Sequence, residues 1–251
     1  MTEAILSVSA LSHKFGRRTV IDDISLKVEK GEFRAIIGPN GAGKTTFFNL
    51  LTGALACRHG EITFRNSRIS NLSAHERCRL GVGRTFQISN VFPNATVAQN
   101  IQIPLLARER RNWQLLSRAC RMLRDEAEEL AGMVGLSASM NKVASALPYG
   151  DRRRLELAIA LAWRPALLLL DEPACGVSLQ ERPALMNLVR SIVRDRGMTA
   201  ILVEHDMDIV FSMADRISVL HRGQLIAEDA PERILKNKEV QDVYLGGRHD
   251  G

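Results

Sequence analysis

The run GPNGAGKT, from Gly38 to Thr45, constrains the fold of this chain more than any other feature. It follows FRAIIG, which is short and apolar enough for a buried strand, and it precedes TTFFNLLTG, which favours a helix ending at Gly53. A glycine-rich turn in this position lets backbone N–H groups converge at the positive end of a helix. The pattern G-x-x-x-x-G-K-[ST] is matched in full, so the turn is predicted to hold the phosphates of a nucleotide.

Two side chains of this turn have tasks of their own in phosphate binding. Lys44 is long enough to reach the outer phosphates, and the hydroxyl of Thr45 is placed to ligate Mg²⁺. The candidate nucleotide-binding residues here are Gly38, Pro39, Asn40, Gly41, Ala42, Gly43, Lys44, Thr45 and Thr46.

A pair of acidic residues ends the apolar run from Leu167 to Leu170. A strand delivers the residues at its carboxyl end to the edge of the sheet where ligands of α/β proteins bind. We expect Asp171 to hold Mg²⁺, directly or through water, and Glu172 to orient and deprotonate the water that attacks a γ-phosphate. For an isolated acidic pair, a strand that ends in a polar loop would be the simpler interpretation. The phosphate-binding pattern in the same chain disfavours that interpretation.

Composition leaves several partners open. A net charge of +6 with 45% apolar residues fits a globular chain that binds nucleic acid, an anionic membrane surface or phosphate ligands, and an ordinary solvated surface is the alternative. No apolar run approaches the roughly 20 residues of a spanning helix, and no signal-peptide pattern opens the chain, so we expect a protein that is not integral to a membrane. The 4 cysteines are scattered, which favours a reduced, cytosolic compartment over a zinc site.

Apolar patterning predicts the order of the elements. Strands are expected at 5–11, 20–28, 33–38, 61–64, 166–173, 198–206 and 215–223. Helices are expected at 45–53, 73–81, 150–163 and 181–195, with two short ones in the tail at 231–247. Strands that alternate with helices in the second half are typical of a parallel sheet covered on both faces.

The central part of the chain differs from the rest. Residues 91–145 carry long charged, helix-favouring runs and few strand-like stretches. We therefore expect an α/β core formed by 1–90 and 146–251, with an antiparallel, β-rich N-terminal part, and an inserted α-helical subdomain formed by 91–145.

Further motifs surround the phosphate loop and the acidic pair in a fixed order. These are Phe15 in HKFG, Gln87 in GRTFQ, Tyr149-Gly150 in LPYGD and His205 in LVEHDM. Together they resemble the ATP-binding subunit of an ABC transporter, and the resemblance runs nearly end to end. It implies an ABC-type P-loop nucleotide-binding domain whose helical insert leads into the signature motif.

The resemblance also implies a role for each motif. Phe15 stacks on adenine, Gln87 touches Mg²⁺ and couples to the membrane partner, and His205 steadies the γ-phosphate. Two subunits pair head to tail, so that Tyr149 and Gly150 of one chain close over the ATP bound by the other. The implied catalytic residues are Glu172, His205, Lys44 and Gln87, and the implied metal ligands are Thr45, Gln87 and Asp171.

Longer segments narrow the resemblance, and one of them, the C-terminal VYLGG, lies outside the ATP chemistry. HERCRLGVGRTFQISNVFPNATVAQNI, EHDMDIVFSMADRISVLHRGQLIAE and the C-terminal VYLGG are similar to the branched-chain amino acid importer branch. This implies a peripheral protein at the cytoplasmic face of the inner (plasma) membrane. Its partners would be membrane permease subunits, a second ATP-binding subunit and, indirectly, a periplasmic solute-binding protein. A heterodimer of ATP-binding subunits is favoured and a homodimer is the alternative.

Other functions stay open beside this one. Urea or amide import and lipopolysaccharide export share much of the pattern. A non-transport ABC ATPase acting on nucleic acid would use the basic charge, but such proteins usually carry two cassettes, a coiled coil or a zinc insertion. This chain has none of these features, so no nucleic-acid partner is expected.

The signature motif departs from the usual LSGGQ, because Leu147–Asp151 reads LPYGD. Pro148 replaces a serine that would donate its hydroxyl across the dimer, so Gly150 and the helix N-terminus are expected to carry that contact. The next three residues, Arg152 to Arg154, place positive charge where a helix disfavours it. They either face the partner's polyphosphate or form an interface cluster satisfied by acidic neighbours such as Glu156.

Overall fold

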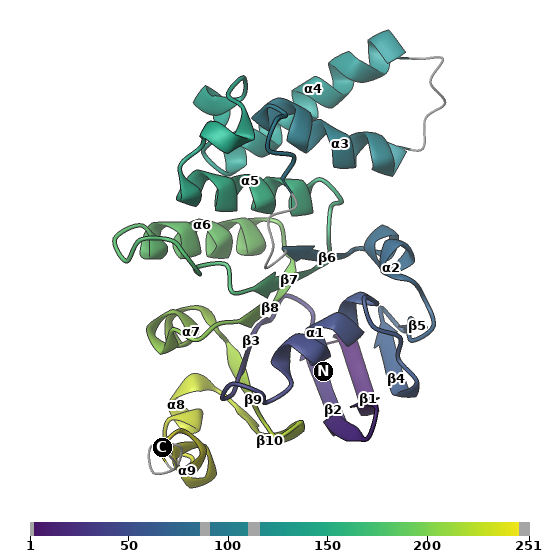
Figure 1. Cartoon of the computed structure of the whole chain (residues 1–251), viewed down its shortest axis with the longest axis vertical. Coiled ribbons are helices and arrows are strands. Elements are labelled where there is room, and N and C mark those ends of the chain that lie inside the picture. The colour runs from purple at the N-terminus through teal and green to yellow at the C-terminus, as the bar shows by residue number, and fades with distance from the viewer. Residues whose placement is uncertain (1–2, 86–90, 110–115, 246–251) are drawn as a thin grey trace.

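The structure is a computed structural model of the whole chain, and it describes residues 3–85, 91–109 and 116–245. Two sheets organise it (Figure 1). The smaller sheet is antiparallel, with the strand order β2 (Arg18–Glu29), β1 (Ala4–Phe15), β4 (His59–Phe64) and β5 (Ser67–Arg68). The larger sheet has the order β10 (Gln224–Asp229), β9 (Arg216–His221), β3 (Phe33–Ile37), β8 (Thr199–Val203), β7 (Leu167–Asp171) and β6 (Val82–Thr85).

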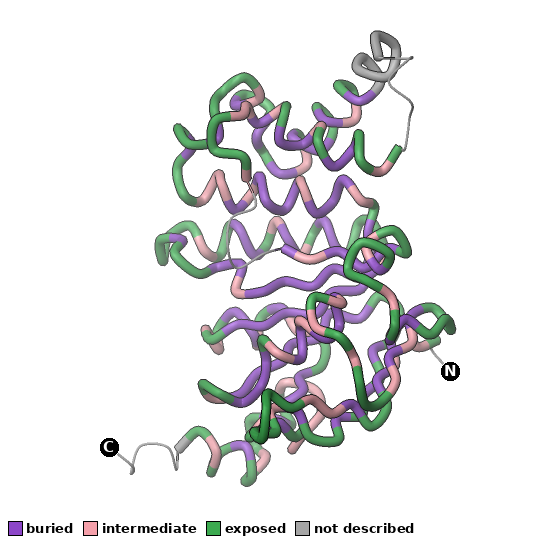
Figure 2. The backbone as a smooth tube through the Cα atoms, turned by 45° about the vertical axis from the view of Figure 1, so that its right-hand side comes forward, coloured by how far each residue is buried: buried purple, intermediate pink, exposed green. Residues whose placement is uncertain are grey.

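The larger sheet is parallel from β9 to β6, and only β10 runs antiparallel to its neighbour. Residues alternate between its faces as strand geometry requires. Leu168 and Leu170 of β7 pack in the core that contains α5 and α6, whereas Leu167 and Leu169 pack with α1 and the smaller sheet. Both faces of the sheet are therefore covered, as the sequence predicts, and Figure 2 shows the buried residues gathered in its strands.

The helices lie on the two faces of the sheet and at one end of the molecule. They are α1 (Lys44–Thr52), α2 (Ala74–Leu80), α3 (Val97–Glu109), α4 (Leu116–Met133), α5 (Tyr149–Leu161), α6 (Arg182–Asp195), α7 (Met207–Met213), α8 (Pro231–Ile234) and α9 (Lys238–Leu245). In Figure 1, α3 and α4 stand at the far end, separated from the sheet by α5 and α6. The helices expected at 45–53, 73–81, 150–163 and 181–195, and the two in the tail, are confirmed. No helix in the described ranges has the length and apolar character needed to cross a bilayer.

Besides the two-residue strand β5, three strands or helices of the described chain are not expected from the sequence. Strand β6 is only VGRT, and its glycine and arginine hide the apolar pattern of a buried strand. Helix α7 is 7 residues long, which is too short for a clear period, although Asp206 caps it by accepting from the N–H groups of Asp208 and Ile209. Strand β10 begins with the exposed Gln224 and is half-buried at every later position, so its burial does not alternate.

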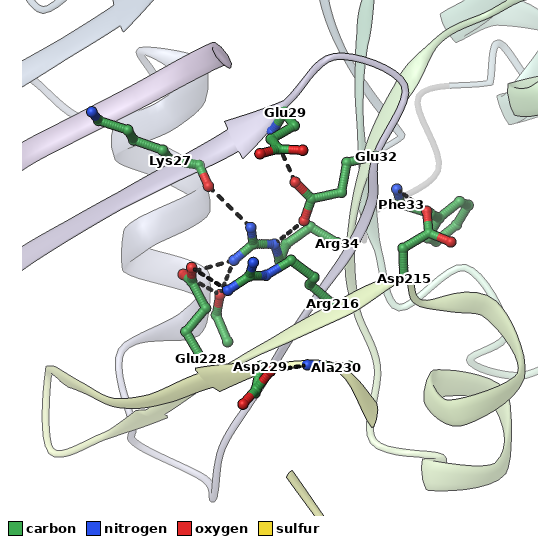
Figure 3. Close-up of polar contacts among 11 residues, drawn as sticks. Lys27, Glu29, Glu32, Phe33, Arg34, Asp215, Arg216, Glu228, Asp229 and Ala230 are labelled. Carbon is green, nitrogen blue, oxygen red and sulfur yellow. Dashed lines mark hydrogen bonds and ion pairs between the residues drawn. The ribbon is translucent and has the colours of Figure 1, made fainter. Parts of the chain in front are cut away.

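A buried ion-pair network ties the two sheets together (Figure 3). At its centre is Arg34 of β3, whose side chain is 1% exposed. Its guanidinium pairs with Glu32 and with Glu228 of β10, the latter at 2.7 Å. It also donates to the hydroxyl of Ser218 at 2.9 Å and to the carbonyl of Lys27 in β2 at 3.0 Å. Strand β3, which leads into the phosphate loop, is thereby bonded through Arg34 to β9 and β10 of its own sheet and to β2 of the smaller sheet.

Candidate functional site

The turn between β3 and α1 is held tightly against its neighbours. Gly38 has φ 156°, and a Cβ built on it would lie 2.1 Å from the carbonyl oxygen of Leu220 in β9. Gly43 has φ 101°, and its Cβ would lie 2.8 Å from the carbonyl oxygen of Val20 in β2. Since side chains are excluded at both positions, the glycines allow the turn to lie directly on the backbone of β9 and β2.

A pocket of about 320 Å³ opens along this turn. Its lining combines residues 40–46 with Arg18 and Val20 of β2, with Glu172 after β7 and with His205 after β8. The structure therefore brings together most of the predicted phosphate loop, the predicted general base Glu172 and His205, which is predicted to steady the γ-phosphate. Gly38 and Pro39 are not in the described lining.

Lys44 folds back onto its own loop. Its Nζ donates to the carbonyl oxygens of Gly38 at 2.6 Å and of Pro39 at 3.1 Å. Burial lowers the pKa of the Lys44 ammonium, and the opposing charges of Glu172 and Asp171 only partly offset this effect. The positive charge is thus held at the loop with carbonyl dipoles as its direct partners.

Asp171 lies at the carboxyl end of β7, with a side chain that is 1% exposed. Its Oδ2 accepts from Nη2 of Arg84 in β6 at 2.6 Å, and Nη1 of the same arginine donates to Oδ1 of Asn49 in α1 at 2.7 Å. The other carboxylate oxygen, Oδ1, has no hydrogen-bond partner among the described residues. A buried carboxylate oxygen without a donor is a candidate cation ligand.

Glu172 and His205 meet across the pocket. Nε2 of His205 lies 3.1 Å from Oε1 of Glu172, and the backbone N–H of Glu172 donates to the carbonyl of Val203 at 2.9 Å. Glu172 has φ 48°, a conformation that a non-glycine residue keeps only when its surroundings enforce it.

A buried glutamate, Glu204, binds the backbone next to Glu172 and His205. Glu204 accepts from the N–H of Ala174 at 2.9 Å and from that of His205 at 3.2 Å, so its carboxylate connects the residues that follow β7 and β8. Burial raises the pKa of the Glu204 carboxyl.

Phe15 lies in a second pocket, of about 500 Å³. Its ring is 51% exposed and meets the ring of His13 edge to face, with the centroids 4.7 Å apart. The same pocket is lined by Leu55 and Arg58 from the connection after α1. Since Phe15 ends β1 and Arg18 begins β2, one hairpin contributes to both pockets.

Tyr149 and Gly150 begin α5 and line neither pocket in the described part of the chain. The Tyr149 ring packs against Gly176, where a Cβ would lie 2.7 Å from it, and its hydroxyl accepts from Arg153 at 2.8 Å. The atom nearest to a Cβ built on Gly150 belongs to Glu181, at 3.6 Å. Within this chain, the predicted nucleotide-binding residues Tyr149 and Gly150 therefore lie away from the phosphate loop.

The three arginines of α5 bind groups of their own chain. Arg152 donates to the carbonyls of Leu147 at 3.1 Å and of Ser145 at 2.6 Å. Arg153 pairs with Glu156 at 2.9 Å, as the second interpretation of the sequence expects. Arg154 donates to the carbonyl of Val134 at 3.2 Å and lies 3.9 Å from a carboxylate oxygen of Asp151. Carbonyls and carboxylates of this chain therefore take up these charges in the structure.

One predicted residue, Gln87, lies outside the described residues. Sequence reasoning also missed several residues around the pocket, namely Arg18, Val20, Asn49, Arg84 and Glu204. Arg84 and Glu204 had a signal nearby, because they stand in the GRTFQ motif that contains Gln87 and in the LVEHDM motif that contains His205.

Comparisons with known proteins agree with this geometry. The family model for "ABC transporter" matches residues 21–175, and that for "Branched-chain amino acid ATP-binding cassette transporter" matches residues 224–250. The high-affinity branched-chain amino acid transport ATP-binding protein BraF of Pseudomonas aeruginosa is 38% identical, over 98% of this chain and 99% of that protein. The lipopolysaccharide export system ATP-binding protein LptB of Haemophilus influenzae is 32% identical, over 97% of this chain and 98% of that protein.

Solved structures give the same result. An ATP-binding cassette of an ABC transporter in its ADP conformation has a TM-score of 0.83 at 28% identity, covering 98% of this chain and 100% of that one. A dimeric cassette in a post-hydrolysis state, bound to ADP and phosphate, has a TM-score of 0.78 at 25% identity, covering 90% and 98%. The chain therefore belongs to the ABC transporter family, as an ATP-binding subunit that hydrolyses ATP to energise transport.

Proposed function

We propose that this subunit energises the import of branched-chain amino acids. The observation that carries the proposal is the match of residues 224–250 to the branched-chain amino acid model, because this segment contributes no residue to the described lining of the phosphate pocket. A similarity confined to ATP chemistry would not distinguish one transporter from another. The identity to BraF over nearly the full length of both chains supports the same substrate class.

We propose that ATP extends from the Phe15 pocket to the phosphate loop. The half-exposed Phe15 ring offers a stacking surface for adenine, and residues 40–46 present backbone N–H groups and the N-terminus of α1 to the phosphates. The β1–β2 hairpin borders both pockets, so it is placed to follow the nucleoside. A phosphate would give Lys44 the negative partner that the carbonyls of its loop do not provide.

The buried carboxylate of Asp171 and the hydroxyl of Thr45 fit a magnesium ion. Oδ1 of Asp171 lacks a donor among the described residues, and Thr45 lines the phosphate pocket. When bound, Mg²⁺ neutralises charge that develops on the phosphates. Gln87 remains a proposed ligand on the sequence motif alone.

We propose Glu172 as the general base and His205 as the group that steadies the γ-phosphate. Both side chains border the pocket, and their 3.1 Å contact keeps each one oriented before a nucleotide arrives. Glu172 would accept a proton from the attacking water, while His205 and Lys44 would hold the phosphate in line for the attack.

We propose that Tyr149 and Gly150 act on the ATP of a partner subunit, which explains why they lie apart from the pocket of their own chain. A head-to-tail pair brings each α5 N-terminus to the opposite phosphate loop, and the dimeric cassette among the similar structures supports such pairing. We further propose a heterodimer with a sister subunit. Residues 91–145 would meet the membrane permeases at the cytoplasmic face of the membrane, with 1–90 and 146–251 as the catalytic core. A periplasmic solute-binding protein would deliver the amino acid.

Glu172→Gln tests the base. The substitution keeps the size of the side chain and removes its basicity, so ATP turnover should fall by at least about 100-fold while ATP binding is retained. Turnover and binding of a fluorescent ATP analogue would be measured on the assembled complex. Glu128→Gln is the matched control, because Glu128 is 53% exposed and, within the described residues, forms its ion pair with Arg124 of the same helix, α4. Full turnover by Glu172→Gln would contradict the assignment.

Solute uptake tests the transport function. A strain without this gene should lose uptake of labelled leucine, isoleucine and valine, and the wild-type gene should restore it. Glu172→Gln should not restore it. The similarity to LptB favours lipopolysaccharide export as the second candidate. In that case the strain would keep amino acid uptake and accumulate lipopolysaccharide in its inner membrane.

A further inference from the structure

Arg84 connects three elements around the phosphate loop. It lies in β6, where Arg84 is paired with Leu169 of β7, two residues before Asp171. One arm of its guanidinium binds Asp171 at 2.6 Å and another binds Asn49 of α1 at 2.7 Å. The side chain is 11% exposed, so water screens these contacts weakly. The end of β7 is therefore bonded through one side chain to the helix that follows the phosphate loop.

The contact with Arg84 uses one carboxylate oxygen of Asp171 and leaves the other without a hydrogen-bond donor among the described residues. Oδ2 is taken by Arg84, whereas Oδ1 is buried and has no donor among the described residues. A carboxylate held by one oxygen on a planar guanidinium cannot rotate freely, so the direction of the other oxygen is fixed as well. A lysine could supply the charge, but it has no two-armed fork with which to bind Asn49 at the same time.

The charge of Arg84 also matters before any metal arrives. Asp171 and Glu172 place two carboxylates beside a pocket that must accept the negative phosphates of ATP. Arg84 neutralises Asp171 directly, at a distance where the attraction in a buried setting is strong. Without it, the Asp171 charge would repel the phosphates unless Mg²⁺ compensated.

We propose that Arg84 is a positioning residue for the magnesium site, one that aims Oδ1 of Asp171 at the metal and offsets the charge of the carboxylate while the metal is absent. This inference rests on the proposed role of Asp171 as a holder of Mg²⁺. It assigns Arg84 no contact with the nucleotide.

The test compares nucleotide binding with and without the metal. Affinity for a fluorescent ATP analogue would be measured in EDTA and in saturating Mg²⁺, for wild type, Arg84→Gln and Arg84→Lys. In Arg84→Gln the affinity in EDTA should fall by about tenfold or more, the size expected for one lost bond between charged groups, while the affinity in Mg²⁺ changes by less than about threefold. Arg84→Lys should keep the wild-type ratio of the two affinities and still lose at least about fivefold in kcat, because the fork is gone.

Each outcome decides a different question. Equal losses of affinity in EDTA and in Mg²⁺ for Arg84→Gln would mean that the residue only supports the fold, and the inference would be wrong. If Arg84→Gln does not fold, an unchanged kcat in Arg84→Lys would overturn it instead. If wild-type binding does not respond to Mg²⁺ at all, the proposed role of Asp171 fails first. Arg68→Gln is the matched control, since Arg68 is 59% exposed and pairs loosely with Glu61 at 3.8 Å.

Discussion

Two glycines of the phosphate loop should respond to alanine in different ways. At Gly38 the new Cβ would lie 2.1 Å from the carbonyl oxygen of Leu220, more than 1 Å inside an ordinary contact of about 3.4 Å. That carbonyl belongs to β9, which is bonded to β3 on one side and to β10 on the other, so it cannot shift without moving the sheet. At Gly41 a Cβ would meet nothing within 4 Å.

The magnitudes follow from these surroundings. Gly41→Ala carries only the strain of its φ of 79°, about 1–2 kcal/mol of unfolding free energy. Gly38→Ala adds overpacking against backbone to a comparable strain, so it should lose about 3 kcal/mol or more. That is a large part of the roughly 5–15 kcal/mol that stabilises a typical domain. Because Gly41 lines the pocket, Gly41→Ala should instead weaken ATP binding.

The assay is urea denaturation of each variant without nucleotide, followed by titration with a fluorescent ATP analogue. Gly41→Ala is expected to lose affinity with little loss of stability, and Gly38→Ala is expected to lose both. A Gly38→Ala variant within about 1 kcal/mol of wild type would refute the steric reasoning, because it would show that β9 can retreat from the loop.

Three further predictions concern the buried charges and the signature. Arg34→Met should lower the unfolding free energy by about 3–5 kcal/mol. Because Arg34 and Glu32 share one interaction, the double variant Arg34→Met with Glu32→Gln should lose less unfolding free energy than the two single variants added together. Additive losses in this double-mutant cycle would contradict the prediction. Burial raises the pKa of Glu204, so the folded state holds the carboxyl proton more tightly than the unfolded state does. The unfolding free energy of wild type relative to Glu204→Gln should therefore fall as pH rises above the ordinary pKa of 4.5. Urea denaturation of both proteins at pH 4 and pH 8 checks the sign of this difference. In the assembled complex, Gly150→Asp should reduce ATP turnover at least about tenfold while Pro148→Ser retains it, and normal turnover by Gly150→Asp would remove the proposed contact across the dimer.

The sequence predicts the parts of the site that depend on neighbours along the chain. The phosphate loop, the carboxylates after β7 and the histidine after β8 could all be placed, because a strand that ends in a motif brings that motif to the sheet edge. Contacts between distant strands were not predictable in this way. Arg84 reaches Asp171 only because β6 pairs with β7, and β6 was not recognised as a strand.

Two residues were assigned to the right place for an incomplete reason. Gly38 was predicted to let the backbone wrap a phosphate, yet the structure presses it against Leu220, a residue 182 positions away in the sequence that no local pattern connects to it. Arg153 has two interpretations from the sequence, contact with a partner's phosphates or a cluster with acidic neighbours such as Glu156, and within this chain it binds Glu156 and Tyr149 of its own helix. Tertiary neighbours therefore decide the surroundings of Gly38, whereas neighbours along one helix take up the charge of Arg153.

The pairing of Arg34 with Glu228 has a consequence for how such chains can diverge. Glu228 belongs to the C-terminal segment that matches the branched-chain amino acid model, whereas Arg34 belongs to the nucleotide-binding core. A truncation before β10, or a foreign tail without an acidic residue at this position, would leave a buried cation in the core without one of its two carboxylates. The tail is therefore not a detachable module, and a functional chimaera of this subunit has to inherit both halves of that ion pair together.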